Sequence, residues 1–377
     1  MMFKWKIMII MTILIVLIKT PISVFAMNID DMITQNLNVL DLKPVESLID
    51  KTGQSTTIDF NELILKAIKG ELNLSPTSIL NEFSKLVFNE IYENNSLMRN
   101  LLVIAFLSAF MKNLTESFEN KGVGELGFFV SYIMLVIVVF SSFNVAVSIA
   151  QTIISDLAGL MEASVPLFIS LIVMSGQVAS AYAFHPVIIF AINIVSFFIK
   201  DFLLPLIVLT AAIHIINYLS EREILDKFSE LMKSFCGWTL KGICFLFISI
   251  LAIQRISVPI LNNVALKTAK SSMGAIPIVG DALTGTMDTV MYFMSATKSG
   301  VLIAMLILII TICSVPIVKL LILFVIYKFM AAVIQPICDS RIVSCMDSIA
   351  GFVILLVSCV VMVTVMFIVS VVIIMSY

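Results

Sequence analysis

Two uncharged apolar runs constrain the fold of this chain more than any other feature of its sequence. They extend from Leu126 to Ala150 and from Ala350 to Ser376, and each exceeds the roughly 20 residues that a helix needs to cross a bilayer. Hydrophobic residues make up 60% of the sequence and charged residues 13%, whereas soluble domains are about one half apolar and one quarter charged. The sequence therefore predicts an all-α, polytopic helical membrane protein.

Charge, cysteine content and missing motifs argue against several classes of function. The net charge is −2 at pH 7, so no basic field favours nucleic acid as a partner. The six cysteines lie in or beside apolar segments without a CxxC pair, which favours buried thiols over metal ligands. The phosphate loop GxxxxGK(S/T), the elbow GxSxG and the zinc helix HExxH are missing from the sequence. We therefore expect no enzymatic activity, no catalytic residues, no cofactor and no metal.

The first 26 residues have the pattern of a signal peptide. Lys4 and Lys6 precede an apolar run, and Val24 and Ala26 are the small residues expected just before a cut after Ala26. We predict cleavage at that point, with an uncleaved membrane anchor as the alternative. On either reading the next segment is delivered outside the cytoplasm.

Residues 27–96 are predicted to form a small extracytoplasmic helical region, with eleven acidic and five basic side chains. Asp59 and Glu62 resemble a capping box, and Gly70 is expected to end the helix that they begin. A second helix is expected to begin at Ser75-Pro76. Their apolar faces consist of Phe60, Leu63, Ile64, Ala67 and Ile68, and of Ile79, Leu80, Phe83, Val87 and Ile91. We expect both faces to pack within the protein, with a partner protein as the alternative.

Residues 97–377 are predicted to form a multi-pass membrane domain of about nine spans. The predicted spans begin near residues 97, 126, 165, 185, 202, 242, 301, 317 and 350. Charged residues or prolines are expected to separate them, with an outside loop at Asp156 and Glu162 and an ion pair at loop level between Lys200 and Asp201. Residues 221–241 carry four basic and four acidic side chains beside one apolar face, which is typical of an amphipathic helix on the cytoplasmic surface.

Residues 255–300 are the long part of the membrane domain that is neither a plain span nor a plain polar loop. The uncharged run between Lys270 and Asp281 is only about half of the roughly 20 residues that a span needs, and Pro277 and Gly280 are expected to interrupt a helix there. Many small residues would let backbones approach closely. We predict a re-entrant or interfacial element, with an amphipathic surface loop as the alternative. Nine spans would place its basic residues outside, which the positive-inside rule disfavours.

We expect this stretch and the later turn near Pro336 to hold positions for packing and assembly rather than reactive groups. The candidate residues are Lys267, Lys270, Pro277, Gly280, Asp281, Asp288, Lys298, Gly300 and Pro336.

Several of these residues lie in motifs that resemble the stage III sporulation protein AE family. The motifs are Lys267-Thr268-Ala269-Lys270, Ile276-Pro277-Ile278-Val279-Gly280-Asp281, Asp288-Thr289-Val290, Lys298-Ser299-Gly300-Val301 and Gln335-Pro336-Ile337-Cys338-Asp339-Ser340-Arg341-Ile342. The resemblance runs from the signal peptide to about Asp347. Members of this family are multi-pass membrane proteins of endospore-forming bacteria.

The resemblance implies a non-enzymatic membrane subunit of the channel or secretion-like complex that links mother cell and forespore. Such a subunit is needed for forespore development and late forespore-specific gene expression. Its implied partners are the lipid bilayer, other membrane proteins of the stage III sporulation A complex and the forespore-side channel partner. Its implied location is the mother-cell membrane around the forespore. The family provides no catalytic residues to transfer.

The residues alone leave a second class of function open. Ionisable groups within apolar helices are the tools of secondary transporters, and Asp281, Lys319 and Lys328 are of this kind. The alternative function is therefore a secondary transporter or permease for a small solute.

Overall fold

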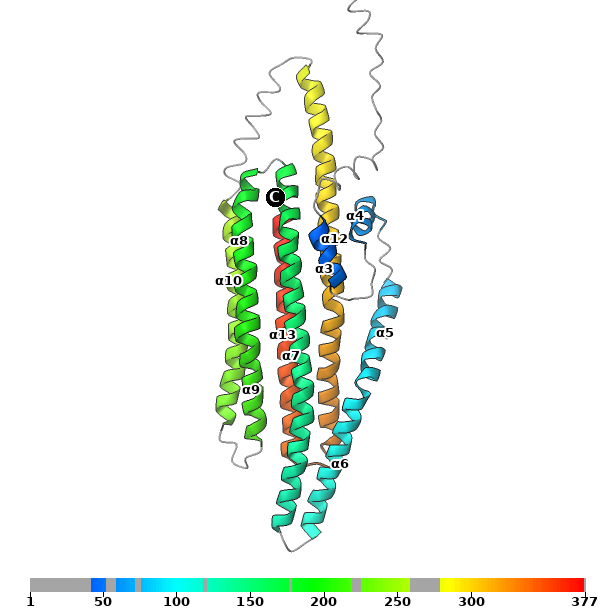
Figure 1. Cartoon of the computed structure of the whole chain (residues 1–377), viewed down its shortest axis with the longest axis vertical. Coiled ribbons are helices and arrows are strands. Elements are labelled where there is room, and N and C mark those ends of the chain that lie inside the picture. The colour runs from blue at the N-terminus through cyan, green and yellow to red at the C-terminus, as the bar shows by residue number, and fades with distance from the viewer. Residues whose placement is uncertain are drawn as a thin grey trace, which may run out of the picture. The chain divides into compact units, whose positions relative to one another are not determined.

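The computed structural model describes residues 42–51, 59–71, 76–117, 121–175, 178–218, 225–257 and 279–375. These residues form helices and no strand, and they belong to one compact unit, Leu40–Tyr377 (Figure 1). The predicted all-α fold is confirmed. The signal peptide and the candidates Lys267, Lys270 and Pro277 lie outside the described residues.

The first described helices are α3 (Lys43–Lys51) and α4 (Phe60–Lys69). The Asp59 side chain accepts a hydrogen bond of 3.2 Å from the Glu62 backbone N–H, and Gly70 ends α4 in the left-handed conformation with φ +71°. Both caps of α4 agree with the sequence prediction. Its apolar face is turned inward, with Phe60, Ile64 and Ala67 buried.

Helix α5 (Pro76–Glu93) begins at the predicted proline, but its apolar face is not packed inside the protein. Leu80, Phe83 and Ile91 are exposed by 65%, 50% and 41%. The prediction of intramolecular packing for this face is therefore wrong at these three residues. Among the α5 side chains whose burial the structure describes, the buried one is Glu90.

Several predicted breaks between spans are absent. Helix α6 (Asn95–Ser117) is followed by α7 (Lys121–Met174), which is unbroken for 54 residues. The expected outside loop at Asp156 and Glu162 is helical, and Pro166 lies inside the same helix. Polar side chains and neighbouring helices can satisfy the backbone groups that a proline frees in a membrane helix, so neither the charges nor the proline ends α7.

The next two predicted spans also form one helical run. Helix α8 (Val178–Phe197) continues through a π-helical segment, η1 (Phe198–Leu203), into α9 (Leu204–Asn217). Lys200 and Asp201, which were expected to lie in a loop, are exposed residues of η1. The charged pair thus coincides with a change of helical geometry rather than with a turn of the chain.

The predicted surface helix 221–241 and the span after it are joined in α10 (Asp226–Ser257), since residues 226–257 are all helical. Its predicted apolar face points outward, with Phe228, Leu231 and Phe235 exposed. Ser229 and Cys236 are buried instead. The helix therefore packs on its neighbours through the face of Ser229 and Cys236, and it leaves an apolar stripe on the outside.

The last two helices are α12 (Val279–Ile334) and α13 (Ser340–Met375). Gly280 is the second residue of α12 and lies at the described start of that helix, so its predicted interruption of a longer helix stays a prediction. Pro316, which was expected to separate two spans, is inside α12.

Helix α13 forms the centre of the packing. It contacts α7, α9, α10 and α12, with the most extensive contact along α12, and Figure 1 shows these helices running side by side. Buried tyrosines tie neighbouring helices together: the Tyr132 hydroxyl donates to the Ile215 carbonyl at 2.8 Å, and the Tyr327 hydroxyl donates to the Val139 carbonyl at 3.2 Å.

Five helical segments among the described residues are long and apolar enough to cross a membrane. They are Phe129–Met174, Pro186–Asn217, Lys227–Ile253, Met294–Ile334 and Ser340–Met375. A shorter apolar helix, Asn95–Met111, precedes them. The chain is thus a polytopic membrane protein, while the total of about nine spans stays a prediction.

Candidate functional site: a close helix crossing and two charged cavities

The closest approach between the amino-terminal helices and the long spans occurs at Gly300. A Cβ atom at this buried position of α12 would overlap the side chain of Ile68 from α4, and it would lie 3.4 Å from the Ile64 carbonyl oxygen. Helix α3 contacts α7 in a looser way, because a Cβ at Gly159 would lie 3.6 Å from Leu48. The region predicted to lie outside the cytoplasm therefore packs directly on α7 and α12.

A charged pair joins α5 to α12 within the apolar part of the bundle. The ammonium of Lys319 lies 3.2 Å from the carboxylate of Glu90, whose side chain is only 8% exposed. Both residues line a cavity of about 530 Å³, together with Asn94, Asn100 and Ser141. Charged groups are costly within a membrane and mark functional positions by default, so this cavity is one candidate site.

A second cavity, of about 460 Å³, lies at the end of the α12–α13 hairpin. Lys328 of α12 forms an ion pair with Asp347 of α13. The Tyr218 and Ser348 hydroxyl oxygens are 2.8 Å apart in its wall. This cavity also gathers charged and polar side chains around an open space.

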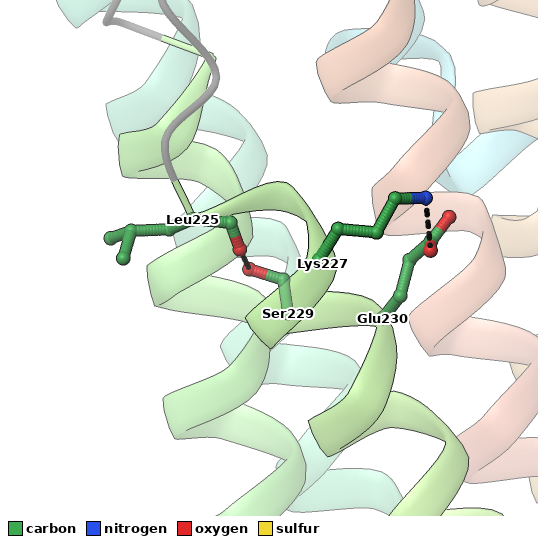
Figure 2. Close-up of polar contacts among 4 residues, drawn as sticks. All are labelled: Leu225, Lys227, Ser229 and Glu230. Carbon is green, nitrogen blue, oxygen red and sulfur yellow. Dashed lines mark hydrogen bonds and ion pairs between the residues drawn. The ribbon is translucent and has the colours of Figure 1, made fainter.

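Figure 2 shows two polar contacts at the start of α10. The Ser229 hydroxyl donates to the Leu225 carbonyl at 2.9 Å, and this serine is fully buried. Lys227 and Glu230 form an ion pair of 3.1 Å with side chains exposed by 90% and 59%. Of the four residues drawn, Lys227 and Glu230 therefore carry the outward charges.

The structure places the predicted assembly residues in three different settings. Gly280, Asp281 and Asp288 are residues of the first three turns of α12. Lys298 is a half-buried residue of α12, two positions before the crossing at Gly300. Pro336 is exposed in the turn that joins α12 to α13. The described residues do not gather these positions into one site, and their role in assembly stays a prediction.

Sequence reasoning missed the partners of the charged residues in the spans. Glu90 was placed in the amino-terminal region and Asp347 in a connecting segment, because spans were defined by the absence of charge. The sequence did contain a signal for these pairs. Lys319 and Lys328 lie within apolar runs, where a charged side chain is expected to pair with an acidic residue from another segment.

The six cysteines form no disulfide. Five are buried and Cys244 is half-buried. Among the described residues, no group of three or more histidine, cysteine or acidic side chains could hold a metal ion. The polar groups described in the two cavities are ion pairs and hydroxyls.

Comparison with known proteins agrees with the motifs in the sequence. The model of the stage III sporulation protein AE family matches residues 58–377. The stage III sporulation protein AE of Bacillus subtilis (strain 168) is 28% identical over 314 residues, which cover 83% of this chain and 79% of that protein. No solved structure matches the chain at a significant level. The family match begins just before α4 and includes every later helix, and the chain therefore belongs to the stage III sporulation protein AE family.

Proposed function

We propose that the protein acts in sporulation as a non-enzymatic membrane subunit of the channel or secretion-like complex that links mother cell and forespore. In this role it supports forespore development and late forespore-specific gene expression. The observation that carries the proposal is the family match over residues 58–377. It includes both the packed amino-terminal helix α4 and all of the spans.

The geometry supports a role in assembly. Helix α4 packs on α12 across Gly300, and α3 contacts α7 at Gly159. Because these helices are tied to the spans, a protein that binds the outer region is coupled mechanically to the membrane part. A subunit that joins components across a membrane needs such a connection.

The proposed partners are other membrane proteins of the stage III sporulation A complex and the forespore-side channel partner. The proposed location is the mother-cell membrane around the forespore. In that location α3 and α4 would face the space between the two membranes.

A deletion strain of the spore-forming host tests this proposal. The full chain with a carboxyl-terminal tag should restore spore yield and the activity of a late forespore-specific reporter. It should also co-purify with the other membrane proteins of the complex from sporulating cells but not from growing cells. Normal sporulation of the deletion strain, or full complementation without any co-purifying protein, would contradict the proposal.

One observation favours transport of a small solute as a second candidate function. Lys319 and Glu90 line a cavity of about 530 Å³ within the apolar bundle, and ionisable groups at such a depth are typical of transport pathways. A transporter works alone, so the purified chain in liposomes should move a solute, and Lys319→Gln should abolish that flux. A subunit of a complex should show no flux in either form.

A further inference from the structure

The cavity at the end of the α12–α13 hairpin lies where two membrane spans end. The spans Met294–Ile334 and Ser340–Met375 meet there, and the cavity has a volume of about 460 Å³. Its polar lining consists of Tyr218, Lys328, Gln335, Ser344, Asp347 and Ser348. A polar cavity at the ends of spans faces the headgroup layer of a bilayer rather than its hydrocarbon core.

The cavity offers both a charge and hydrogen-bond donors. The ammonium of Lys328 is paired with Asp347, but their side chains are 45% and 55% exposed, so a ligand can reach the ammonium. An ammonium has three N–H donors, and one ion pair leaves donors for a ligand. The hydroxyls of Tyr218 and Ser348 lie beside this pair at 2.8 Å from each other.

A second lysine reaches the same part of α13 from α10. The ammonium of Lys233 lies 5.0 Å from the centre of the Phe352 ring and occupies the space beside Gly351. Gly351 is four residues after Asp347 and therefore on the same face of the helix. Lys233 interacts electrostatically with both Asp347 and Lys328.

The charges of the described side chains around the cavity do not balance. Lys233 and Lys328 contribute two positive charges, and Asp347 contributes one negative charge. Glu230 is the other described acid that interacts with Lys233, and it is paired with Lys227 at 3.1 Å. These described groups leave an excess of one positive charge at the end of the hairpin, and an anion with one negative charge would neutralise it.

An apolar stripe runs along the outer face of α12, next in sequence to residues that line the cavity. Val325, Phe329 and Val333 are exposed by 57%, 55% and 40%, and their spacing of four places them on one face of the helix. Phe329 directly follows Lys328. In a membrane, a stripe of this kind contacts lipid chains.

We propose that this cavity binds the phosphate-bearing headgroup of an anionic phospholipid, whose acyl chains lie along Val325, Phe329 and Val333. Basic pockets between spans are suited to such headgroups. A zwitterionic headgroup brings its own cation and gains nothing from the excess positive charge. Inorganic phosphate matches the charge, but it lacks the chains that would contact the apolar stripe.

Native mass spectrometry of the full chain in detergent tests the proposal by titration with three probes. The probes are dioleoylphosphatidylglycerol, dioleoylphosphatidylcholine and inorganic phosphate. We expect phosphatidylglycerol to bind at least about fivefold more tightly than phosphatidylcholine, as for one basic side chain near a bilayer. Equal binding of the two lipids would overturn the proposal. Binding of phosphate alone, without a preference between the lipids, would show a site for a soluble anion and would also overturn it.

Charge variants assign the binding to this cavity. Lys328→Gln and Lys233→Gln should each weaken phosphatidylglycerol binding about fivefold, whereas Asp347→Asn should strengthen it. Lys66→Gln is the matched control, because it removes the same charge from an exposed position of α4, which does not line the cavity. If Lys328→Gln fails to fold, the opposite effects expected of Lys233→Gln and Asp347→Asn still decide the question. An equal loss in Lys66→Gln, or weaker binding in Asp347→Asn, would contradict the assignment.

Discussion

Ile68 of α4 fills the space that a side chain at position 300 of α12 would need. The position of a Cβ lies 2.3 Å from Ile68 Cγ1, the second carbon of that side chain rather than its far end, and 3.4 Å from the Ile64 carbonyl oxygen, which is an ordinary contact. The crossing therefore accepts a methyl group only if Ile68 moves. Glycine at position 300 thus fixes how near the amino-terminal helices lie to the spans.

Gly300→Ala should lower the free energy of unfolding by about 1–3 kcal/mol, the usual cost of overpacking. Thermal unfolding of the full chain in detergent measures this change. Gly242→Ala is the matched control, because a Cβ there has no atom within 4 Å. The control should leave stability unchanged or raise it by up to about 1 kcal/mol through better helix propensity.

A second substitution tests whether the cost arises at this crossing. Ile68→Ala in the Gly300→Ala background should recover part of the lost stability, since it removes the overlapping atoms. Purely additive effects of the two substitutions would place the strain elsewhere and contradict the crossing as its cause.

Gly351→Ala should be much less harmful than Gly300→Ala, although its Cβ would lie 2.5 Å from the Lys233 ammonium nitrogen. The obstructing atom is the end of a long side chain, which can rotate away at a cost below about 1 kcal/mol. The same thermal measurement compares the two variants. Equal losses of stability would mean that Lys233 is held rigidly over Phe352.

Lys319→Gln should destabilise the protein by about 2 kcal/mol, because it leaves the buried Glu90 carboxylate without its cationic partner. The double variant Glu90→Gln with Lys319→Gln should be more stable than the single variant, since no unpaired charge is left. Chemical unfolding in detergent of the unchanged protein, both single variants and the double variant measures the coupling between the two residues.

An exposed ion pair provides the control for this experiment. Glu62 and Lys66 lie 2.7 Å apart on α4, with side chains exposed by 61% and 49%. Lys66→Gln should leave the stability nearly unchanged, as is usual for surface pairs. A loss in Lys66→Gln as large as that in Lys319→Gln would show that burial of Glu90 is not the reason.

Cysteine labelling tests the predicted sides of the membrane. In a background without the native thiols, Ser47→Cys on α3 should react with an impermeant maleimide in intact cells. Lys227→Cys should react only after the membrane is opened. Lys227 is the suitable position on α10 because its side chain is 90% exposed, whereas Ser229 is buried. Equal labelling in intact cells would contradict the predicted topology.

Local signals in the sequence were sufficient for features that depend on a few adjacent residues. The caps of α4 at Asp59 and Gly70 follow from short-range chemistry, and the structure contains both. Apolar composition likewise predicted a bundle of membrane helices. These features need no knowledge of what packs against them.

Features that depend on distant contacts could not be predicted in the same way. Asp156 and Glu162 suggested a loop and Pro166 suggested the start of a new span, yet α7 is continuous through all three and packs against other helices. The pairing of Glu90 with Lys319 joins segments far apart in the chain. The sequence did not indicate which face of α10 would be buried, because lipid chains are as apolar as the side chains of residues such as Phe235.

The unbroken length of α7 has a mechanical consequence. Its 54 residues correspond to about 80 Å at a rise of about 1.5 Å per residue, against a hydrocarbon thickness of about 30 Å. The helix is therefore a continuous rod that is longer than the bilayer is thick. This one helix contains both Gly159, where α3 contacts α7, and Tyr132, whose hydroxyl donates to the Ile215 carbonyl. A force on α3 is thus transmitted along one continuous helix from Gly159 to Tyr132.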